Sequence, residues 1–238
     1  MTDVMRRAYC APMKPRELLS ESVTPDGAPI TLTREAEALV VRVSGVPLMS
    51  SRVHGSEDAM AEVGCAPLRA REGARVLVGG LGMGFTLRAT LDALGSDAEV
   101  VVSELLPIVV EWNRGPLAPL AGRPLEDPRV RLEVGHLAAL VKRSPPRSYD
   151  ALLLDVDNGP EAFTVASNAW LYARPGIDAL KALLRPGGAL VVWSASKSPR
   201  FERDLRAAGL TSEVVPVRAR GPIKKGSRHL LYVGRAGL

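Results

Sequence analysis

The sequence has few cysteines, few aromatic residues and no long apolar run. Only two of its 238 residues are cysteines, Cys10 and Cys65, and they lack the spacing of a zinc site or a redox pair. No stretch approaches the roughly twenty apolar residues that a membrane-spanning helix needs. The charges of the first seven residues have no apolar core behind them, which is not the pattern of a secretory signal. We therefore expect a reduced, cytoplasmic protein without a metal site or a membrane segment.

The chain is basic, with a formal net charge of +5. Its basic residues are scattered, and aromatic residues, which stack on nucleic-acid bases, make up only 4% of the sequence. One local cluster contains Arg218, Arg220, Lys224, Lys225 and Arg228. This pattern favours a small-molecule or peptide substrate over nucleic acid, although the cluster keeps an RNA substrate open.

From about residue 71, short apolar runs alternate with helical patterns. The expected strands are residues 75–79, 99–104, 130–134, 149–155, 189–194, 211–217 and 229–234. The expected helices are residues 85–94, 107–113, 137–142, 177–184 and 199–208. Such alternation predicts an α/β fold with a doubly wound, mostly parallel sheet of seven strands. A basic turn joins the last two strands, which we expect to form an antiparallel hairpin at one edge.

Residues 1–70 predict a smaller region, followed by the main domain at residues 71–238. Prolines interrupt residues 1–20, so we expect an irregular arm there. Residues 30–51 predict a β-hairpin, and Ser56 is expected to cap a short helix that ends near Val63.

A glycine-rich turn follows the strand expected at residues 75–79. It contains Gly79, Gly80, Gly82 and Gly84, and the next strand ends in Glu104. Glycines let the backbone approach a ligand closely, and an acid at the tip of the next strand can bind ribose hydroxyls. We therefore predict a pocket for a nucleoside-bearing cofactor. The alternative is a tight turn without a ligand.

The strand at residues 149–155 ends in a second acidic segment. Asp155 and Asp157 point the same way if the chain stays extended, and Asn158 follows them. Clustered acids bind cationic substrates, and one of them can accept a proton. We predict that these three residues orient and deprotonate an amine. The alternative is a strand end followed by an ordinary turn.

Several segments together resemble the spermidine synthase-like branch of the S-adenosylmethionine (SAM)-dependent transferases. These segments are residues 127–130 (DPRV), 135–136 (GH), 149–155 (YDALLLD) and 184–188 (LRPGG). The resemblance covers about residues 31–234, and residues 51–57 resemble the tyrosine–histidine segment of that branch. It implies the Rossmann-like fold of the class I SAM methyltransferases with a small N-terminal β-extension.

The resemblance also implies roles for individual residues. The glycine turn would pass beside the methionine part of the cofactor, Glu104 would bind the ribose, and Asp155 would face the reacting amine. His136 stands where the branch has an aspartate that contacts adenine. The remaining implied cofactor contacts are Met83, Leu105 and Leu137. Substrate contacts are expected from His54, Trp170 and Tyr172.

Two departures from the branch bear on the reaction. The aminopropyltransferases carry an aspartate in the glycine loop, whereas Leu81-Gly82-Met83 supplies no acid here. A lost charge-assisted contact is worth roughly 1.5–3 kcal/mol, which disfavours polyamine synthesis. The branch's Asp-Ser-Ser-Asp-Pro stretch appears here as residues 155–160 (DVDNGP), with its acids shifted.

We therefore expect methyl transfer from SAM to an amine or another nucleophile of a small molecule or peptide. Aminopropyl transfer from decarboxylated SAM to a polyamine is the same-fold alternative. A non-catalytic nucleoside-binding protein is the alternative from a different class. The sequence leaves open whether the protein forms a homodimer.

Overall fold

The computed structural model describes residues 16–156, 159–160, 168–220 and 226–238. The chain divides into two compact units between Arg52 and Val53, which is earlier than the boundary expected after residue 70. Helix α1 (Gly55–Cys65) accounts for the difference, because it packs on the large sheet. A Cβ added to Gly64 would lie 2.4 Å from a methyl carbon of Leu153, so this contact is close.

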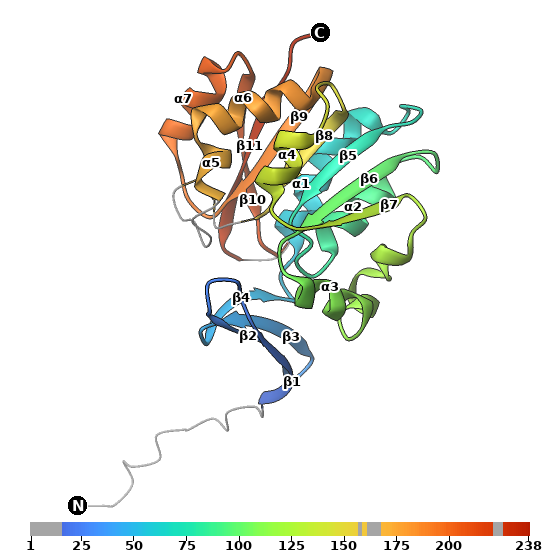
Figure 1. Cartoon of the computed structure of the whole chain (residues 1–238), viewed down its shortest axis with the longest axis vertical. Coiled ribbons are helices and arrows are strands. Elements are labelled where there is room, and N and C mark those ends of the chain that lie inside the picture. The colour runs from blue at the N-terminus through green and yellow to red at the C-terminus, as the bar shows by residue number, and fades with distance from the viewer. Residues whose placement is uncertain (1–15, 157–158, 161–167, 221–225) are drawn as a thin grey trace, which may run out of the picture. The chain divides into compact units, whose positions relative to one another are not determined.

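The N-terminal unit is a four-stranded antiparallel sheet in the order β1-β2-β3-β4 (Figure 1). Its strands are β1 (Arg16–Val23), β2 (Pro29–Glu35), β3 (Ala38–Val43) and β4 (Val46–Ser50). The expected hairpin is part of this larger sheet. The expectation of an irregular arm was wrong for residues 16–20, which belong to β1. Because β1 is a largely exposed edge strand, its sequence lacks the apolar alternation that would have revealed it.

The larger unit contains a seven-stranded sheet in the order β10-β11-β9-β8-β5-β6-β7. Its strands are β5 (Arg75–Gly79), β6 (Glu99–Glu104), β7 (Val130–Val134), β8 (Tyr149–Leu154), β9 (Leu184–Ser194), β10 (Thr211–Arg218) and β11 (Arg228–Arg235). Strands β5 to β9 pair in parallel, while β11 is antiparallel to both β9 and β10. The doubly wound, mostly parallel sheet is confirmed, and so is the hairpin at one edge.

Helices cover both faces of this sheet (Figure 1). They are α1, α2 (Phe85–Ala93), α3 (Pro107–Arg114), α4 (Leu137–Arg143), α5 (Ala169–Tyr172), α6 (Arg174–Leu183) and α7 (Pro199–Ala207). Side chains of a strand alternate between faces. Leu152 and Leu154 join the core under α4, α6 and α7, whereas Leu153 meets α1 on the other face.

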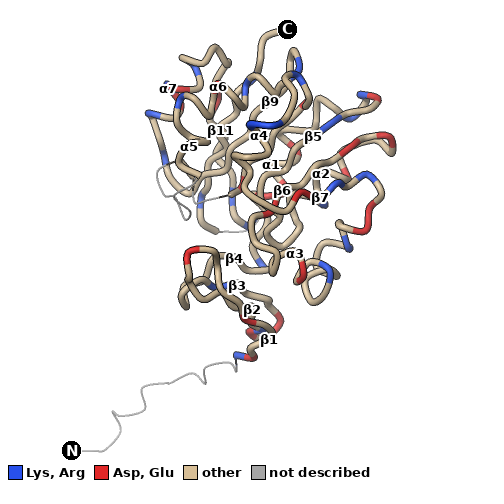
Figure 2. Tube along the Cα trace, in the orientation of Figure 1, with Lys and Arg blue, Asp and Glu red and all other residues tan. Residues whose placement is uncertain are grey.

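The amino ends of the central strands are joined through Asp150. This residue is 2% exposed. Its carboxylate accepts a hydrogen bond from the backbone N–H of Arg75 at 2.8 Å and forms ion pairs with Arg71 and Arg185 at 2.9 and 2.8 Å. Basic residues elsewhere are spread along the described trace of the larger unit, interspersed with acids (Figure 2). The scattered charge pattern inferred from the sequence therefore persists in three dimensions.

Candidate functional site

The candidate site lies where the carboxyl ends of β5, β6 and β8 meet. Gly79 at the end of β5 pairs with Ser103 of β6 on one side and with Leu154 of β8 on the other. Glu104 and Asp155 each follow these partners by one residue, so they flank the start of the glycine turn. The chain reverses its winding direction at β5, and ligands of open α/β sheets bind at such switch points.

The glycine turn is shaped by its close approach to β8. Gly80 has a φ of +92°, and a Cβ on it would lie 2.2 Å from the carbonyl oxygen of Asp155. Gly80 donates its N–H to the Ser103 carbonyl at 2.8 Å, and Asp155 donates its N–H to the Gly79 carbonyl at 2.8 Å. A side chain at Gly80 would push the turn away from β8, so the geometry requires glycine there.

Glu104 joins the loops that follow β5 and β6. Its Oε2 accepts from the Leu81 N–H at 3.0 Å and its Oε1 from the Leu106 N–H at 2.8 Å. Burial raises the pKa of Glu104, and these backbone hydrogen bonds act in the opposite direction. An acid at the tip of this strand can accept hydrogen bonds from the hydroxyl groups of a ribose. The site therefore fits a ligand with neighbouring hydroxyl groups.

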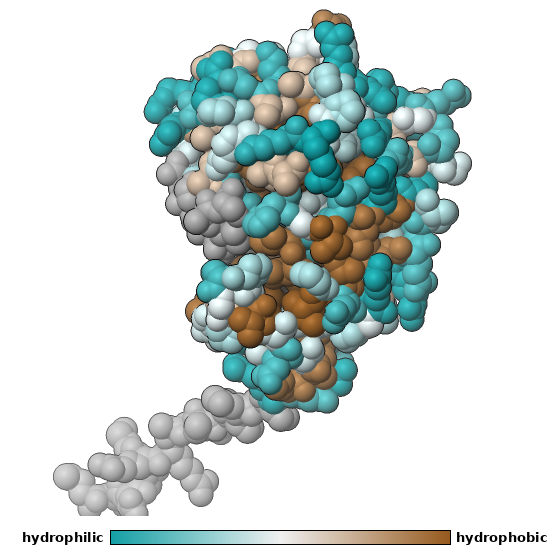
Figure 3. All heavy atoms as spheres, in the orientation of Figure 1, coloured by the Kyte–Doolittle hydropathy of each residue, from teal (hydrophilic) through white to brown (hydrophobic). Residues whose placement is uncertain are grey.

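Open space and apolar surface adjoin Glu104. A Cβ on Gly135, whose φ is +144°, would meet nothing within 4 Å. An apolar patch lies over the ends of β6 and β7, where Val134 is 53% exposed (Figure 3). A flat aromatic ligand would cover such a surface.

A second acid, Glu57 in the first turn of α1, acts electrostatically on Asp155. Asp155 is partly buried. Burial raises its pKa to about 7, and the negative charge of Glu57 adds to the increase. Burial also raises the pKa of Glu57, and the Ser56 hydroxyl opposes that shift. Among the described residues, no basic side chain forms an ion pair with either acid.

The start of α1 is tied to the β10–β11 hairpin. The Gly55 N–H donates to the Ala219 carbonyl at 2.8 Å. Ser56 was expected to cap the helix, but α1 begins at Gly55 after His54 and has no side-chain cap. The Ser56 hydroxyl instead donates to Glu57 Oε2 at 2.6 Å and lies 3.1 Å from His229 Nδ1. The expected capping role of Ser56 was therefore wrong.

The other residues expected around the cofactor differ in exposure. His136 is exposed before α4, and Leu105 is partly buried after β6. Met83 and Leu137 are each 4% exposed, and Leu137 belongs to the core. The side chains of these two residues therefore contribute to packing. Any contact that they make with a ligand would come from their backbone atoms.

The residues expected to contact the substrate make the following contacts in the structure. His54 stacks on Phe85 with ring centroids 4.3 Å apart and pairs with Asp58 at 2.9 Å. Trp170 packs under the ammonium of Lys142, 4.6 Å from its ring centroid. Tyr172 is buried against Phe201, so it packs in the core and does not wall an open pocket. Asp157 and Asn158 lie outside the described residues.

Glu57, Ser56 and His229 were missed from the sequence. The only available signal was the acid in the first turn of a helix within residues 51–57, the segment that resembles the tyrosine–histidine segment. Within the part of the chain that the structure describes, no group of three or more metal-ligating side chains converges, and no helix is long and apolar enough to cross a membrane.

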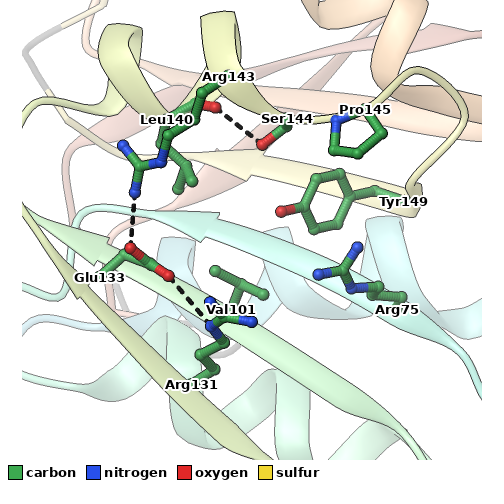
Figure 4. Close-up of a pocket in the computed structure, with 9 residues that line it drawn as sticks. All are labelled: Arg75, Val101, Arg131, Glu133, Leu140, Arg143, Ser144, Pro145 and Tyr149. Atoms are coloured by element: carbon green, nitrogen blue, oxygen red, sulfur yellow. Dashed lines mark hydrogen bonds and ion pairs between the residues drawn. The ribbon is translucent and has the colours of Figure 1, made fainter.

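A separate cavity of about 220 Å³ lies near the amino ends of the strands (Figure 4). Arg75 and Tyr149, which begin β5 and β8, line it. Arg131 and Arg143 also line it, but both are held by Glu133 at 3.1 and 2.6 Å. Because Glu104 and Asp155 stand at the opposite ends of their strands, this cavity is not part of the candidate site.

Sequence comparisons find relatives among polyamine-related transferases over about half of this chain. No family model matches the chain. It is 33% identical to putrescine N-methyltransferase 2 of Nicotiana attenuata over 122 residues, which are 51% of this chain and 31% of that protein. It is 33% identical to spermine synthase of Arabidopsis thaliana over 116 residues, 48% of this chain and 30% of that protein. The matched region thus spans about a third of these curated relatives.

Solved structures extend the likeness over most of the fold. Spermidine synthase of Thermotoga maritima superimposes with a TM-score of 0.71 at 16% identity, covering 93% of this chain and 73% of that one. A spermidine synthase in complex with the transition-state analogue AdoDATO gives 0.73 at 17% identity, covering 93% and 74%. The resemblance to the spermidine synthase-like branch is confirmed. At these identities the structures establish the fold alone.

The raised pKa of Asp155 predicts how stability depends on pH. The folded protein holds the Asp155 proton more tightly than the unfolded chain, so this stabilisation is complete below pH 3.8 and is lost as the pH rises towards about 7. The Asp155→Asn variant should lack this loss. The quantity to measure is the free energy of unfolding of the variant minus that of the wild type, obtained by chemical denaturation. We expect this difference to be larger at pH 8 than at pH 5 by on the order of 1–4 kcal/mol. An equal difference at both pH values would contradict the raised pKa.

Proposed function

We propose that this chain transfers a methyl group from SAM to an amine of a small cationic substrate. The observation that carries the proposal is the Glu57–Asp155 pair, which forms no ion pair with a basic side chain among the described residues and adjoins the glycine turn. Two neighbouring carboxyl groups without a counter-charge favour a cationic ligand. The names of the relatives refer to small cationic amines: putrescine N-methyltransferase is named for its amine substrate and spermine synthase for its amine product.

The residues around Glu104 fit the nucleoside part of SAM. The Glu104 carboxylate would accept hydrogen bonds from the ribose hydroxyls, and the apolar surface at β6 and β7 would cover the adenine. Gly80, Gly82 and Gly84 would let the backbone lie against the methionine part. When bound, SAM supplies a methyl group on a positively charged sulfur, which a neutral amine can attack.

The acid pair would prepare the amine for this attack. An alkylamine is protonated near neutral pH and has no free lone pair in that state. Asp155, whose pKa lies near 7, can hold the ammonium and accept its proton. The carboxyl group of Glu57, in the same pair, would help to orient the amine.

Aminopropyl transfer from decarboxylated SAM is the second candidate, and the spermidine synthase fold favours it. The glycine turn favours the methyl reaction. Leu81 and Met83 are both buried, 3% and 4% exposed, and neither supplies an acid to bind a further cationic group. An uncharged turn also tolerates the carboxylate of intact SAM.

Cofactor binding can be measured by calorimetry with SAM, decarboxylated SAM and methylthioadenosine. We expect SAM to bind, and Glu104→Gln to weaken binding by about tenfold or more, because hydrogen bonds to a charged acceptor are worth roughly 1.5–3 kcal/mol. Glu99→Gln is the matched control, since Glu99 stands at the other end of β6 and pairs with Arg75. Preference for decarboxylated SAM would favour aminopropyl transfer. If none of the three ligands bound, the nucleoside site would be disproved.

The mass of the product distinguishes methyl transfer from aminopropyl transfer. Incubation with SAM and a primary diamine should give a product heavier by one methyl group, detected by mass spectrometry. Asp155→Asn should lower kcat by about a hundredfold, because general-base catalysis contributes at least that much. Asp178→Asn, an exposed residue of α6 paired with Arg174, should leave turnover unchanged. A bound cofactor with no product from any amine would favour a non-catalytic nucleoside-binding protein.

A further inference from the structure

We propose that Ser56 and His229 form a proton relay that carries the proton of the substrate amine from the Glu57–Asp155 pair to solvent. This inference rests on the amine methylation proposed above. Both residues act through Glu57 and are therefore positioning residues with no assigned contact to substrate.

The reaction requires such an exit. The ammonium substrate first gives one proton to the carboxyl pair. The freed lone pair then forms the C–N bond while the C–S bond breaks and its electrons pass to sulfur. The product leaves as a methylated ammonium ion, so one proton remains on the carboxyl pair after every turnover. Unless that proton leaves, the pair cannot accept another.

The contacts supply a continuous path from Glu57. Ser56 is 1% exposed, and its hydroxyl oxygen lies 2.6 Å from Glu57 Oε2 and 3.1 Å from His229 Nδ1. In the resting arrangement the Ser56 hydroxyl donates to Glu57. When Glu57 is protonated, its O–H can donate to Ser56 while Ser56 donates to a neutral His229. A buried hydroxyl between an acid and an imidazole thus passes a proton by reversing two hydrogen bonds.

His229 is placed to release the proton. It is the second residue of β11, is only partly buried, and meets the ring of Trp193 edge-on at 4.5 Å. Burial lowers the pKa of His229, which favours release of a proton from its imidazole. The charged side chains on the neighbouring elements are Glu57 and Asp58 of α1, Arg218 of β10 and Arg228 of β11. Asp58 is paired with His54, which leaves Glu57 as the acid connected to the path.

A purely structural role would use the same contacts to tie the β10–β11 hairpin to α1. The two roles predict different results. An anchor changes stability and substrate binding, whereas a relay changes kcat and its dependence on pH and on buffer.

The test combines Ser56→Ala and His229→Ala with Ser96→Ala as control, since Ser96 is exposed in the turn before β6. Turnover of a primary diamine is followed across pH. Both relay variants should lose about tenfold in kcat near pH 7 with KM for the amine nearly unchanged, and added imidazole should restore His229→Ala. Unchanged kcat, or a loss that imidazole does not restore, would overturn the relay.

A measurement without substrate checks the hydrogen-bonded path by itself. The His229 imidazole is titrated by NMR in the wild type, Ser56→Ala and Glu57→Gln. We expect both variants to shift the His229 titration, because Glu57 acts on it through Ser56. An identical titration in all three proteins would overturn the path. If the titration shifts but the wild type turns over no amine, the proposed function fails and the relay fails with it. Turnover with normal kcat in both variants overturns the relay alone.

Discussion

The repulsion between Glu57 and Asp155 is the constraint on which the account of the site depends. Burial and the neighbouring carboxyl both disfavour the charged form of Asp155 and raise its pKa to about 7. Among the described residues, neither acid forms an ion pair with a basic side chain, and His54 is the only basic side chain whose charge opposes the rise in the pKa of Glu57. The fold thus maintains an unfavourable arrangement at the carboxyl edge of its sheet, and a cationic ligand would relieve it.

The two acids beside β5 differ in what their surroundings allow. Glu104 is held in place by hydrogen bonds from the backbone N–H groups of Leu81 and Leu106. Burial and the charge of Glu57 raise the pKa of Asp155 to about 7, so this acid can gain or lose a proton near neutral pH. The same sheet edge therefore offers a rigid acceptor suited to a nucleoside and a titratable acid suited to an amine. Gly79 pairs with the residue before Glu104 on one side and with the residue before Asp155 on the other, so both acids lie beside the start of the glycine turn.

Much of the large sheet was predictable because its strands are short apolar runs separated by helical patterns. Glu104 and Asp155 were also predictable, since each directly follows such a run. Glu57, Ser56 and His229 were not, because tertiary packing brings α1 to the ends of β8 and β11 and no local pattern marks these contacts. Ser56 and His229 are separated by 173 positions. Strand β1 was missed for the opposite reason, because an exposed edge strand carries little apolar signal.

Direct titration of the Asp155 carboxyl carbon by NMR, with and without a diamine, tests the central claim. The account predicts a pKa near 7 for Asp155 in the free protein, a lower pKa in Glu57→Gln, and a lower pKa again when the wild type binds the diamine. An Asp155 pKa near the ordinary 3.8, insensitive to both Glu57 and the diamine, would contradict an amine site at this acid pair.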